Sequence, residues 1–335
     1  MEFLYEYGLF LAKVATFVAA ILIVIAAAVG AASRQNKGKG QLDITSLSEQ
    51  IEQLTMHAKQ LVLSKDAFKK LTKEKKKQDK NKDEQSTNLF VIDFKGSMDA
   101  HEVECLREEI SAILHVASDK DEVLVRLESG GGVVHGYGLA ASQLQRIKDA
   151  NIKLTVCVDK VAASGGYMMA CVADKVIAAR FAIIGSIGVI AQLPNFNKVL
   201  KKHDIEFEQH TAGQFKRTLT LFGENNEAGR QKFREELEDV HQMFKTFVQD
   251  NRAELDIDNV ATGEYWYGAK AHELGLVDEI GTSDDVLMKA VDSHKIFSVK
   301  YSQKRNVAEK LGLAAAQGAE ALLGKIWQKS TQPFQ

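Results

Sequence analysis

A serine between small residues stands where a strand-like run gives way to a helix-like one. The run is Ala163-Ser164-Gly165-Gly166, and residues 167–172 have the composition of a helix. A serine in such a turn exposes its hydroxyl, and the N-terminus of the helix behind it supplies N–H donors for a developing oxyanion. The same position also suits a serine that only caps the helix. Ser164 is therefore a candidate nucleophile that needs further support.

A second candidate is the glycine-rich loop Ser129-Gly130-Gly131-Gly132, which follows an apolar strand-like run. Glycines let the backbone approach a substrate and present an N–H without side-chain obstruction, as an oxyanion hole requires. A phosphate-binding loop is the alternative. It is disfavoured because the loop lacks both the GxGxxG spacing and the lysine of a Walker sequence.

Ser164 also needs a base that takes its proton. Lys216, in the segment 211–217, follows a strand-like stretch and sits beside a phenylalanine. A neutral lysine can act as a base in an apolar setting, although a lysine taken alone is usually a solvated surface charge. A Ser-His-Asp triad stays open, but none of the nearby histidines lies in a local serine-hydrolase signature. These histidines are His101, His115, His135, His203 and His210.

The elements that would position these residues alternate between strands and helices. Strands are expected at 89–94, 122–127, 153–158 and 175–179, and helices at about 100–116, 139–147 and 227–252. This alternation predicts an α/β fold with a largely parallel sheet. We expect the catalytic domain to span residues 89–299.

An apolar stretch from Val14 to Ala32 precedes this domain. Its length of about 19 residues corresponds to roughly 28 Å of helix, which matches a bilayer core, so residues 1–33 are expected to form a transmembrane anchor. A cleaved signal peptide is the alternative, but the leading residues are acidic and the apolar run is long for one. Basic residues just after the stretch favour a cytoplasmic domain by the positive-inside rule.

Residues 34–88 read as a polar helix over 44–71 followed by a lysine-rich, solvated linker over 73–84. Contact of that lysine run with anionic lipid or nucleic acid is the alternative. Residues 300–335 form a tail with apolar residues at helical spacing between 307 and 327. The tail could dock on a neighbouring copy, on the membrane or on its own domain.

Composition narrows the function classes. The formal charge of −2 gives no global case for nucleic-acid binding. The three cysteines, Cys105, Cys157 and Cys171, are far apart and form no CxxC pair, so neither a disulfide framework nor a zinc site is supported. Neither a metal nor an organic cofactor is expected.

Six ordered motifs give the chain a family resemblance. Across residues 89–280 it resembles the signal peptide peptidase A (protease IV) family, and most closely the SohB-type membrane members of that family. Gly130 departs from the pattern, because the family commonly has proline there. The motifs are Asp93–His101, Arg126–Gly138, Asp159–Tyr167, Gly185–Val189, Thr211–Arg217 and Trp266–Asp278.

The resemblance implies a ClpP/crotonase-like fold and a serine endopeptidase with a Ser/Lys dyad. Ser164 matches the nucleophile, Lys216 the base and Ser186 a hydroxyl that orients the lysine, while Gly131 and Gly165 match the two donors of the oxyanion hole. It further implies a bacterial inner-membrane protein that forms homo-oligomers and cleaves signal-peptide remnants or membrane and envelope proteins. The side of the membrane stays open, because the flanking charge favours the cytoplasm whereas relatives in the family often work outside it.

Two other functions fit the same fold class. Crotonase-like folds also host acyl-CoA enzymes, which use paired amides without a nucleophilic serine. A membrane scaffold that keeps the fold without hydrolytic activity is the second alternative.

Overall fold

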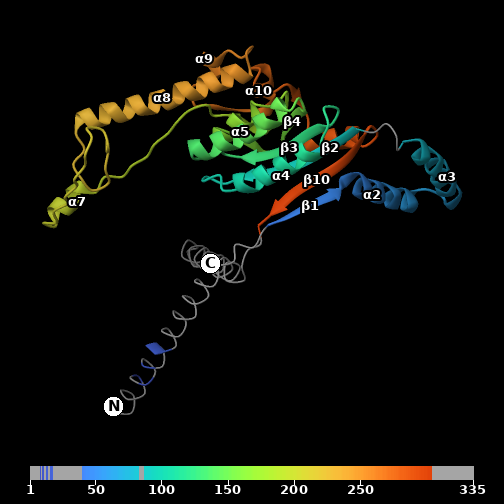
Figure 1. Cartoon of the computed structure of the whole chain (residues 1–335), viewed down its shortest axis with the longest axis horizontal. Helices are drawn as coiled ribbons and strands as arrows, with labels where there is room; N and C mark the ends of the chain where they lie inside the picture. The colour runs from blue at the N-terminus through green and yellow to red at the C-terminus, as the bar shows by residue number, and fades with distance from the viewer. Residues whose placement is uncertain are drawn as a thin grey trace, which may run out of the picture. The chain divides into compact units, whose positions relative to one another are not determined.

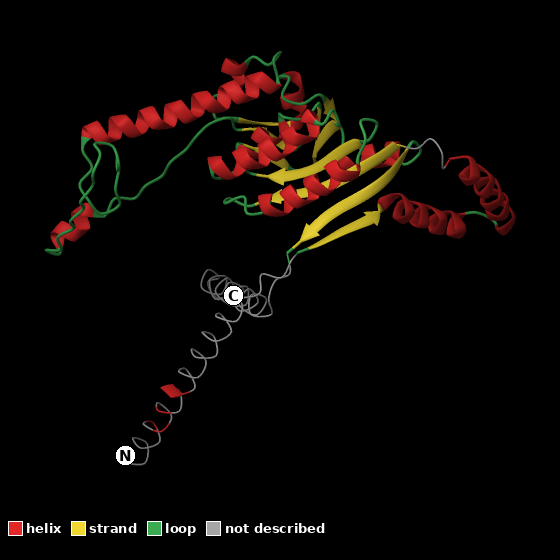
Figure 2. Cartoon of the chain, in the orientation of Figure 1, coloured by secondary structure: helices red, strands yellow, loops and turns green. Residues whose placement is uncertain are grey.

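The computed structural model describes residues 40–82 and 87–303, and within the first 39 residues only a few more. Residues 42–301 form one compact unit. The architecture below is that of the 42–301 unit (Figures 1 and 2). The further described residues are Gly8, Phe10, Lys13, Thr16 and Phe17.

A parallel sheet forms the centre of the fold. Its strands read as near-continuous apolar runs because both faces are covered, as Leu89 to Ile92 illustrate with four consecutive buried side chains. Each of these strands pairs in parallel with the next in the order β2-β3-β4-β6-β9. The strands are β2 (Thr87–Gly96), β3 (Glu122–Ser129), β4 (Lys153–Val158), β6 (Lys175–Ala178) and β9 (Glu279–Ile280). The predicted α/β class and its parallel pairing are thus confirmed.

Helices cover both faces of this sheet. Helices α4 (Val103–Val116) and α5 (Val134–Asp149) contribute Leu106, Ile110 and Leu144 to the larger core. The other face carries a smaller core, in which Val91 and Leu124 meet Leu287 of α11 (Ser283–Ala290).

The sheet extends beyond the strands that the sequence indicated. Strand β10 (His294–Ser302) lies parallel to β2, and β1 (Gln41–Ser46) pairs with β10. Residues close to both ends of the 42–301 unit therefore share one edge of the sheet (Figure 1).

A short side branch of the sheet carries the candidate site. Strand β5 (Val161–Ala163) pairs with the end of β3 and with β7 (Ile183–Gly185), and β7 pairs antiparallel with β8 (Tyr265–Tyr267). Helix α6 (Gly165–Ala170) begins directly after β5, with Ser164 between them. All six residues of α6 are buried, so the turn at Ser164 is held from both sides.

Helix α8 (Glu227–Asn251) is long, and only its C-terminal part reaches the core. Its buried residues are Phe244 and Val248. The short helices α9 (Ile257–Val260) and α10 (Gly268–Glu273) follow it and lead back to the sheet. Residues 190–226, here called the arm, include α7 (Asn197–Lys202) and fold beside the N-terminal end of α8 (Figure 1).

The N-terminal side of the unit departs from expectation in two ways. The prediction of a single helix over residues 44–71 is wrong, because residues 41–46 form β1 and the helical structure is interrupted at Leu63. Helix α2 (Leu47–Val62) is capped by Ser46, whose side chain accepts the Glu49 N–H, and it ends where Leu63 is extended with φ −86° and ψ 151°. The lysine-rich run, expected as a linker, is helical to the end of α3 (Lys65–Lys82).

No helix among the described residues is long and apolar enough to cross a membrane. The expected span at 14–32 falls almost wholly outside those residues, as does the tail after residue 303.

Candidate active site

Ser164 occupies a strained turn between β5 and α6. Its φ of 52° and ψ of −119° lie in a region that residues with a Cβ rarely adopt. Such a conformation costs of order 1–3 kcal/mol and persists only where the surroundings enforce it. Here the Ser164 N–H donates to the Gly185 carbonyl at 2.8 Å, and the Ser164 carbonyl accepts the Met168 N–H at 2.9 Å. The geometry resembles the strand-turn-helix elbow that presents nucleophilic serines.

The two glycines after Ser164 are required by close packing. A Cβ on Gly165 would lie 2.4 Å from the Tyr137 ring, and one on Gly166 would lie 2.5 Å from the Ser129 carbonyl oxygen. Helix α6 therefore packs against β3 and α5 at backbone distance. The Gly165 N–H is the first of the helix and has no partner within it, which leaves it available to an oxyanion.

The glycine loop touches the serine turn directly. Gly131 has φ +85°, and a Cβ there would lie 2.7 Å from the Ala163 oxygen, 2.7 Å from the Gly165 nitrogen and 2.8 Å from the Ser164 Cβ. The structure thus brings Ser164, Gly165 and Gly131 together. The Gly131 N–H donates to the Ser129 hydroxyl at 3.1 Å, whereas the following N–H, that of Gly132, makes no hydrogen bond within the described residues.

A buried hydrogen-bond chain supports the loop from behind, and sequence reasoning missed it. The Ser129 hydroxyl, which accepts the Gly131 N–H, also bonds to the Tyr137 hydroxyl. Tyr137 in turn donates to the Ser97 carbonyl at 2.8 Å. Both Ser129 and Tyr137 are at most 2% exposed. A polar residue at the end of an apolar strand was the one available signal, and the partner Tyr137 is eight residues away on another element.

Ser186 lies one residue beyond the carbonyl that holds the Ser164 N–H. It also has a positive φ, of 50°. Its N–H donates to the Glu264 carbonyl at 2.7 Å, and its hydroxyl donates to the Gly263 carbonyl at 3.3 Å. Ser186 therefore lies beside the turn at Ser164, directly after β7.

Lys216 lies on the arm and is exposed. Its neighbour Phe215 contacts α8 at Lys232, whose Nζ is 5.8 Å from the ring centroid. Phe244 is the first residue of α8 that is buried in the core. Lys232 lies twelve residues before it, which corresponds to roughly 18 Å of helix, so the segment around Lys216 packs at a distance from the core. Among the described residues no hydrogen bond joins the side chains of Lys216 and Ser164. Within one chain, the structure does not bring the two together.

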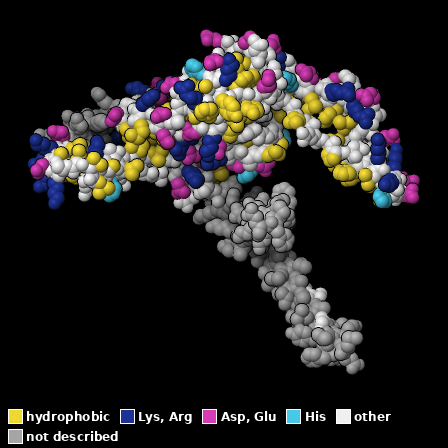
Figure 3. All heavy atoms as spheres, turned by 180° about the vertical axis from the view of Figure 1, so that it is seen from behind, with side chains coloured by type: hydrophobic (Ala, Val, Ile, Leu, Met, Phe, Trp, Pro, Cys, Tyr) yellow, Lys and Arg dark blue, Asp and Glu magenta, His cyan; other side chains and the backbone are white. Residues whose placement is uncertain are grey.

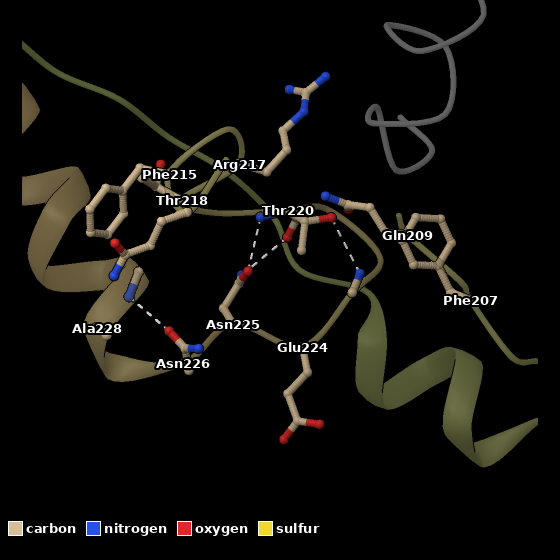
Figure 4. Close-up of a pocket in the computed structure, with 13 residues that line it drawn as sticks. Phe207, Gln209, Phe215, Arg217, Thr218, Thr220, Glu224, Asn225, Asn226 and Ala228 are labelled. Carbon is tan, nitrogen blue, oxygen red and sulfur yellow. Dashed lines mark hydrogen bonds between the residues drawn. The ribbon is translucent and has the colours of Figure 1, made fainter. Parts of the chain in front are cut away.

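The arm and the start of α8 line an open cavity of about 450 Å³, to which both sequence neighbours of Lys216 contribute (Figure 4). Phe207 and Phe215 stand at opposite sides of it, and Asn225 holds the backbone at Thr220 (Figure 4). The Asn225 side chain accepts the Thr220 N–H at 2.9 Å and donates to the Thr220 carbonyl at 3.1 Å. The segment that carries Lys216 is thus an ordered structure built against the start of α8.

The histidines considered as alternative bases make no hydrogen bond to Ser164 within the described residues. His101 bonds instead to Ser97 and Asp99, at 2.9 Å each. The hydrogen bond from Ser97, together with that from His101, lowers the pKa of Asp99 to about 2. His115 contacts the carbonyl of Ser111, in its own helix. A Ser-His pair at Ser164 is therefore absent from the described part of the chain.

Comparisons with known proteins agree on one family. Residues 2–144 match the peptidase family S49 N-terminal region, and residues 146–297 match peptidase family S49. A probable protease SohB of Haemophilus influenzae is 46% identical over 99% of both chains. A probable protease SohB of Buchnera aphidicola from Acyrthosiphon pisum is 55% identical over 71% of both chains.

A solved structure is also similar, at a lower level. It is a lysine-to-alanine mutant of the 1510-N membrane-bound stomatin-specific protease in complex with a substrate peptide. The similarity covers 61% of this chain and 80% of that one, with 14% identity and a TM-score of 0.41. A likeness of this size supports no argument about the site.

Proposed function

Since this chain belongs to peptidase family S49 and is a serine protease, we propose that Ser164 is its nucleophile and Lys216 its general base. The observation that carries the proposal is the strained turn at Ser164, against which Gly131 and Gly165 pack. Strain of this kind is retained where function requires a side chain to be presented. Membership of the family also disfavours a scaffold without activity and an acyl-CoA enzyme.

The proposed reaction proceeds in two steps. The Ser164 oxygen attacks a peptide carbonyl while the neutral Lys216 amine takes the hydroxyl proton, and that proton then passes to the leaving amine. The oxyanion receives hydrogen bonds from the Gly165 N–H and from the Gly131 N–H, which exchanges its bond to Ser129 for one to the oxyanion. Water, deprotonated by Lys216, then hydrolyses the acyl-enzyme. Ser186 is the hydroxyl that orients the lysine.

In our proposal Lys216 reaches Ser164 from a second copy of the chain. The arm lies beside the N-terminal end of α8 and exposes many apolar side chains. Hydrophobic side chains gather over this end of the unit (Figure 3). Exposed apolar surface of this extent is typical of an interface. A homo-oligomer would cover it and complete the site. The exposed residues, each at least 37% accessible, are Ile190, Leu193, Phe196, Val199, Ile205, Phe207, Phe215, Leu221 and Phe222.

The remaining elements of the proposal concern location and substrate. We propose that residues 1–33 anchor the chain in the bacterial inner membrane by a single span, that residues 34–88 connect it to a ClpP/crotonase-like domain at 89–299, and that residues 300–335 form an amphipathic tail. Substrates are peptides, including signal-peptide remnants and membrane or envelope proteins. The apolar length of residues 14–32 supports the anchor.

Covalent labelling by a fluorophosphonate tests the nucleophile and the base. We expect labelling of the detergent-solubilised protein to disappear in Ser164→Ala and in Lys216→Arg, because arginine stays protonated at any working pH. His135→Ala serves as the matched control and should label like the wild type. Retained labelling in Lys216→Arg with loss in His135→Ala would overturn the lysine base.

A further inference from the structure

The junction of α2 and α3 exposes a continuous apolar segment. Leu61, Val62 and Leu63 are 73%, 83% and 37% exposed. Leu54, seven residues before Leu61 and therefore on the same face of α2, is 72% exposed. These four residues, here called the elbow patch, leave a stripe of large aliphatic side chains in contact with water, and hydrophobic side chains are visible at this end of the unit (Figure 3).

A strongly basic helix begins two residues after the elbow patch. Helix α3 holds nine lysines against three carboxylates, an excess of six positive charges in 18 residues, whereas the whole chain carries a charge of −2. In its first part Lys65, Lys69, Lys70 and Lys73 are exposed. Within the described residues none of these four lysines forms an ion pair, although many lysines elsewhere in the unit do.

We propose that the elbow patch and α3 together bind the surface of an anionic lipid bilayer. Aliphatic side chains next to lysines are the combination that peripheral membrane segments use, since the former enter the acyl boundary and the latter meet the phosphates. The proposal rests on the membrane anchor proposed above. From Ala32 to Gln41 the chain spans at most about 30 Å even when fully extended, so the start of the folded unit stays close to the bilayer.

Two other partners fit these observations less well. A second copy of α3 would bring an equal excess of positive charge, and like charges at close range repel. Single-stranded nucleic acid is bound through basic residues combined with aromatic side chains that stack on bases, whereas the elbow patch offers leucine and valine. The charge and the aliphatic side chains are complementary to a bilayer that contains phosphatidylglycerol.

Hydrogen exchange of the full chain in lipid nanodiscs tests the proposal. The discs contain phosphatidylcholine alone or with 30% phosphatidylglycerol, and the readout is exchange of the amides in residues 54–73. We expect slower exchange only in the anionic discs, with the effect lost at high salt. In Lys69→Glu/Lys70→Glu the slowing of exchange in the anionic discs should fall by at least about fivefold for each lysine, because loss of one lysine's attraction alone amounts to about fivefold and the new carboxylate is repelled as well. Leu61→Ser/Val62→Ser should also reduce it.

A control variant makes the same charge change elsewhere. Lys198→Glu/Lys202→Glu, on the exposed helix α7, should leave the exchange of residues 54–73 unchanged. Equal exchange in neutral and anionic discs, with the chain retained in both, contradicts the bilayer surface as partner. If exchange in lipid-free detergent is slow and depends on protein concentration, the patch binds a second copy of the chain. If exchange in detergent is slow only when RNA is added, the patch binds nucleic acid. Loss of the chain from the discs would instead contradict the anchor.

Discussion

An alanine at position 131 probes the contact between the glycine loop and the turn at Ser164. Its Cβ would lie 2.7–2.8 Å from two backbone atoms and from the Ser164 Cβ, and backbone atoms cannot swing away as a flexible side chain can. The positive φ of 85° adds a cost of about 1–2 kcal/mol for a residue with a Cβ. Overpacking adds about 1–3 kcal/mol. Gly131→Ala should therefore lower the free energy of unfolding by about 2–5 kcal/mol.

The same substitution should also disturb the reaction. Relief of the overlap requires the turn at Ser164 to move by a few tenths of an ångström to 1 Å, and a displacement of that size can cost about 100-fold in rate. The adjacent Gly130→Ala is the matched control, because its Cβ would meet nothing within 4 Å and its φ lies outside the strained positive range. The assay is the rate of fluorophosphonate labelling, with thermal unfolding measured in parallel. Equal labelling rates in the two variants would refute the packing of Gly131 on Ser164.

Two further substitutions address buried polar groups. Burial raises the pKa of Glu109 from 4.5 to about 7. Between these pH values the folded chain binds more protons than the unfolded chain, so the free energy of unfolding falls as pH rises through them, by about 3 kcal/mol in total. Glu109→Gln keeps an acceptor for the Tyr301 N–H and should exceed the wild type in denaturant stability at pH 8 but not at pH 4. Tyr137→Phe leaves the Ser97 carbonyl and the Ser129 hydroxyl without the tyrosine hydroxyl as a partner. The free energy of unfolding should fall by about 1–3 kcal/mol, and labelling of Ser164 should slow. Unchanged stability and labelling would contradict a supporting role for this hydrogen-bond chain.

The sequence was informative where local pattern and tertiary structure coincide. The strand at Lys153–Val158 was predicted with the bounds that it has, and the junction of β5 and α6 was predicted around Ser164. Short apolar runs between glycine-rich turns are a local signal. The association of Gly131 with Ser164 was inferred only through family resemblance, because 33 residues separate them and no local pattern encodes their contact.

Other features depend on information that the sequence lacks. Strand β10 has only two buried residues, three positions apart, and so lacks the alternation of a half-buried strand; its partner β2 lies far earlier in the chain. The lysine run reads as a linker because it lacks apolar residues, yet lysine itself has good helix propensity, and the helix continues to Lys82. The position of Lys216 on the arm could not be predicted, since spacing along the chain says nothing about which copy a side chain serves.

Complementation between two inactive variants tests the central claim most directly, namely that Lys216 of one copy activates Ser164 of another. Ser164→Ala and Lys216→Ala chains are each purified, shown to be inactive, and then co-assembled in equal amounts before peptidase activity is measured. If the base comes from a neighbour, random assembly restores about a quarter of the wild-type activity, because one site in four combines both intact side chains. If both residues come from the same chain, no mixed site is complete. Mixed assemblies that form but stay inactive would contradict the account.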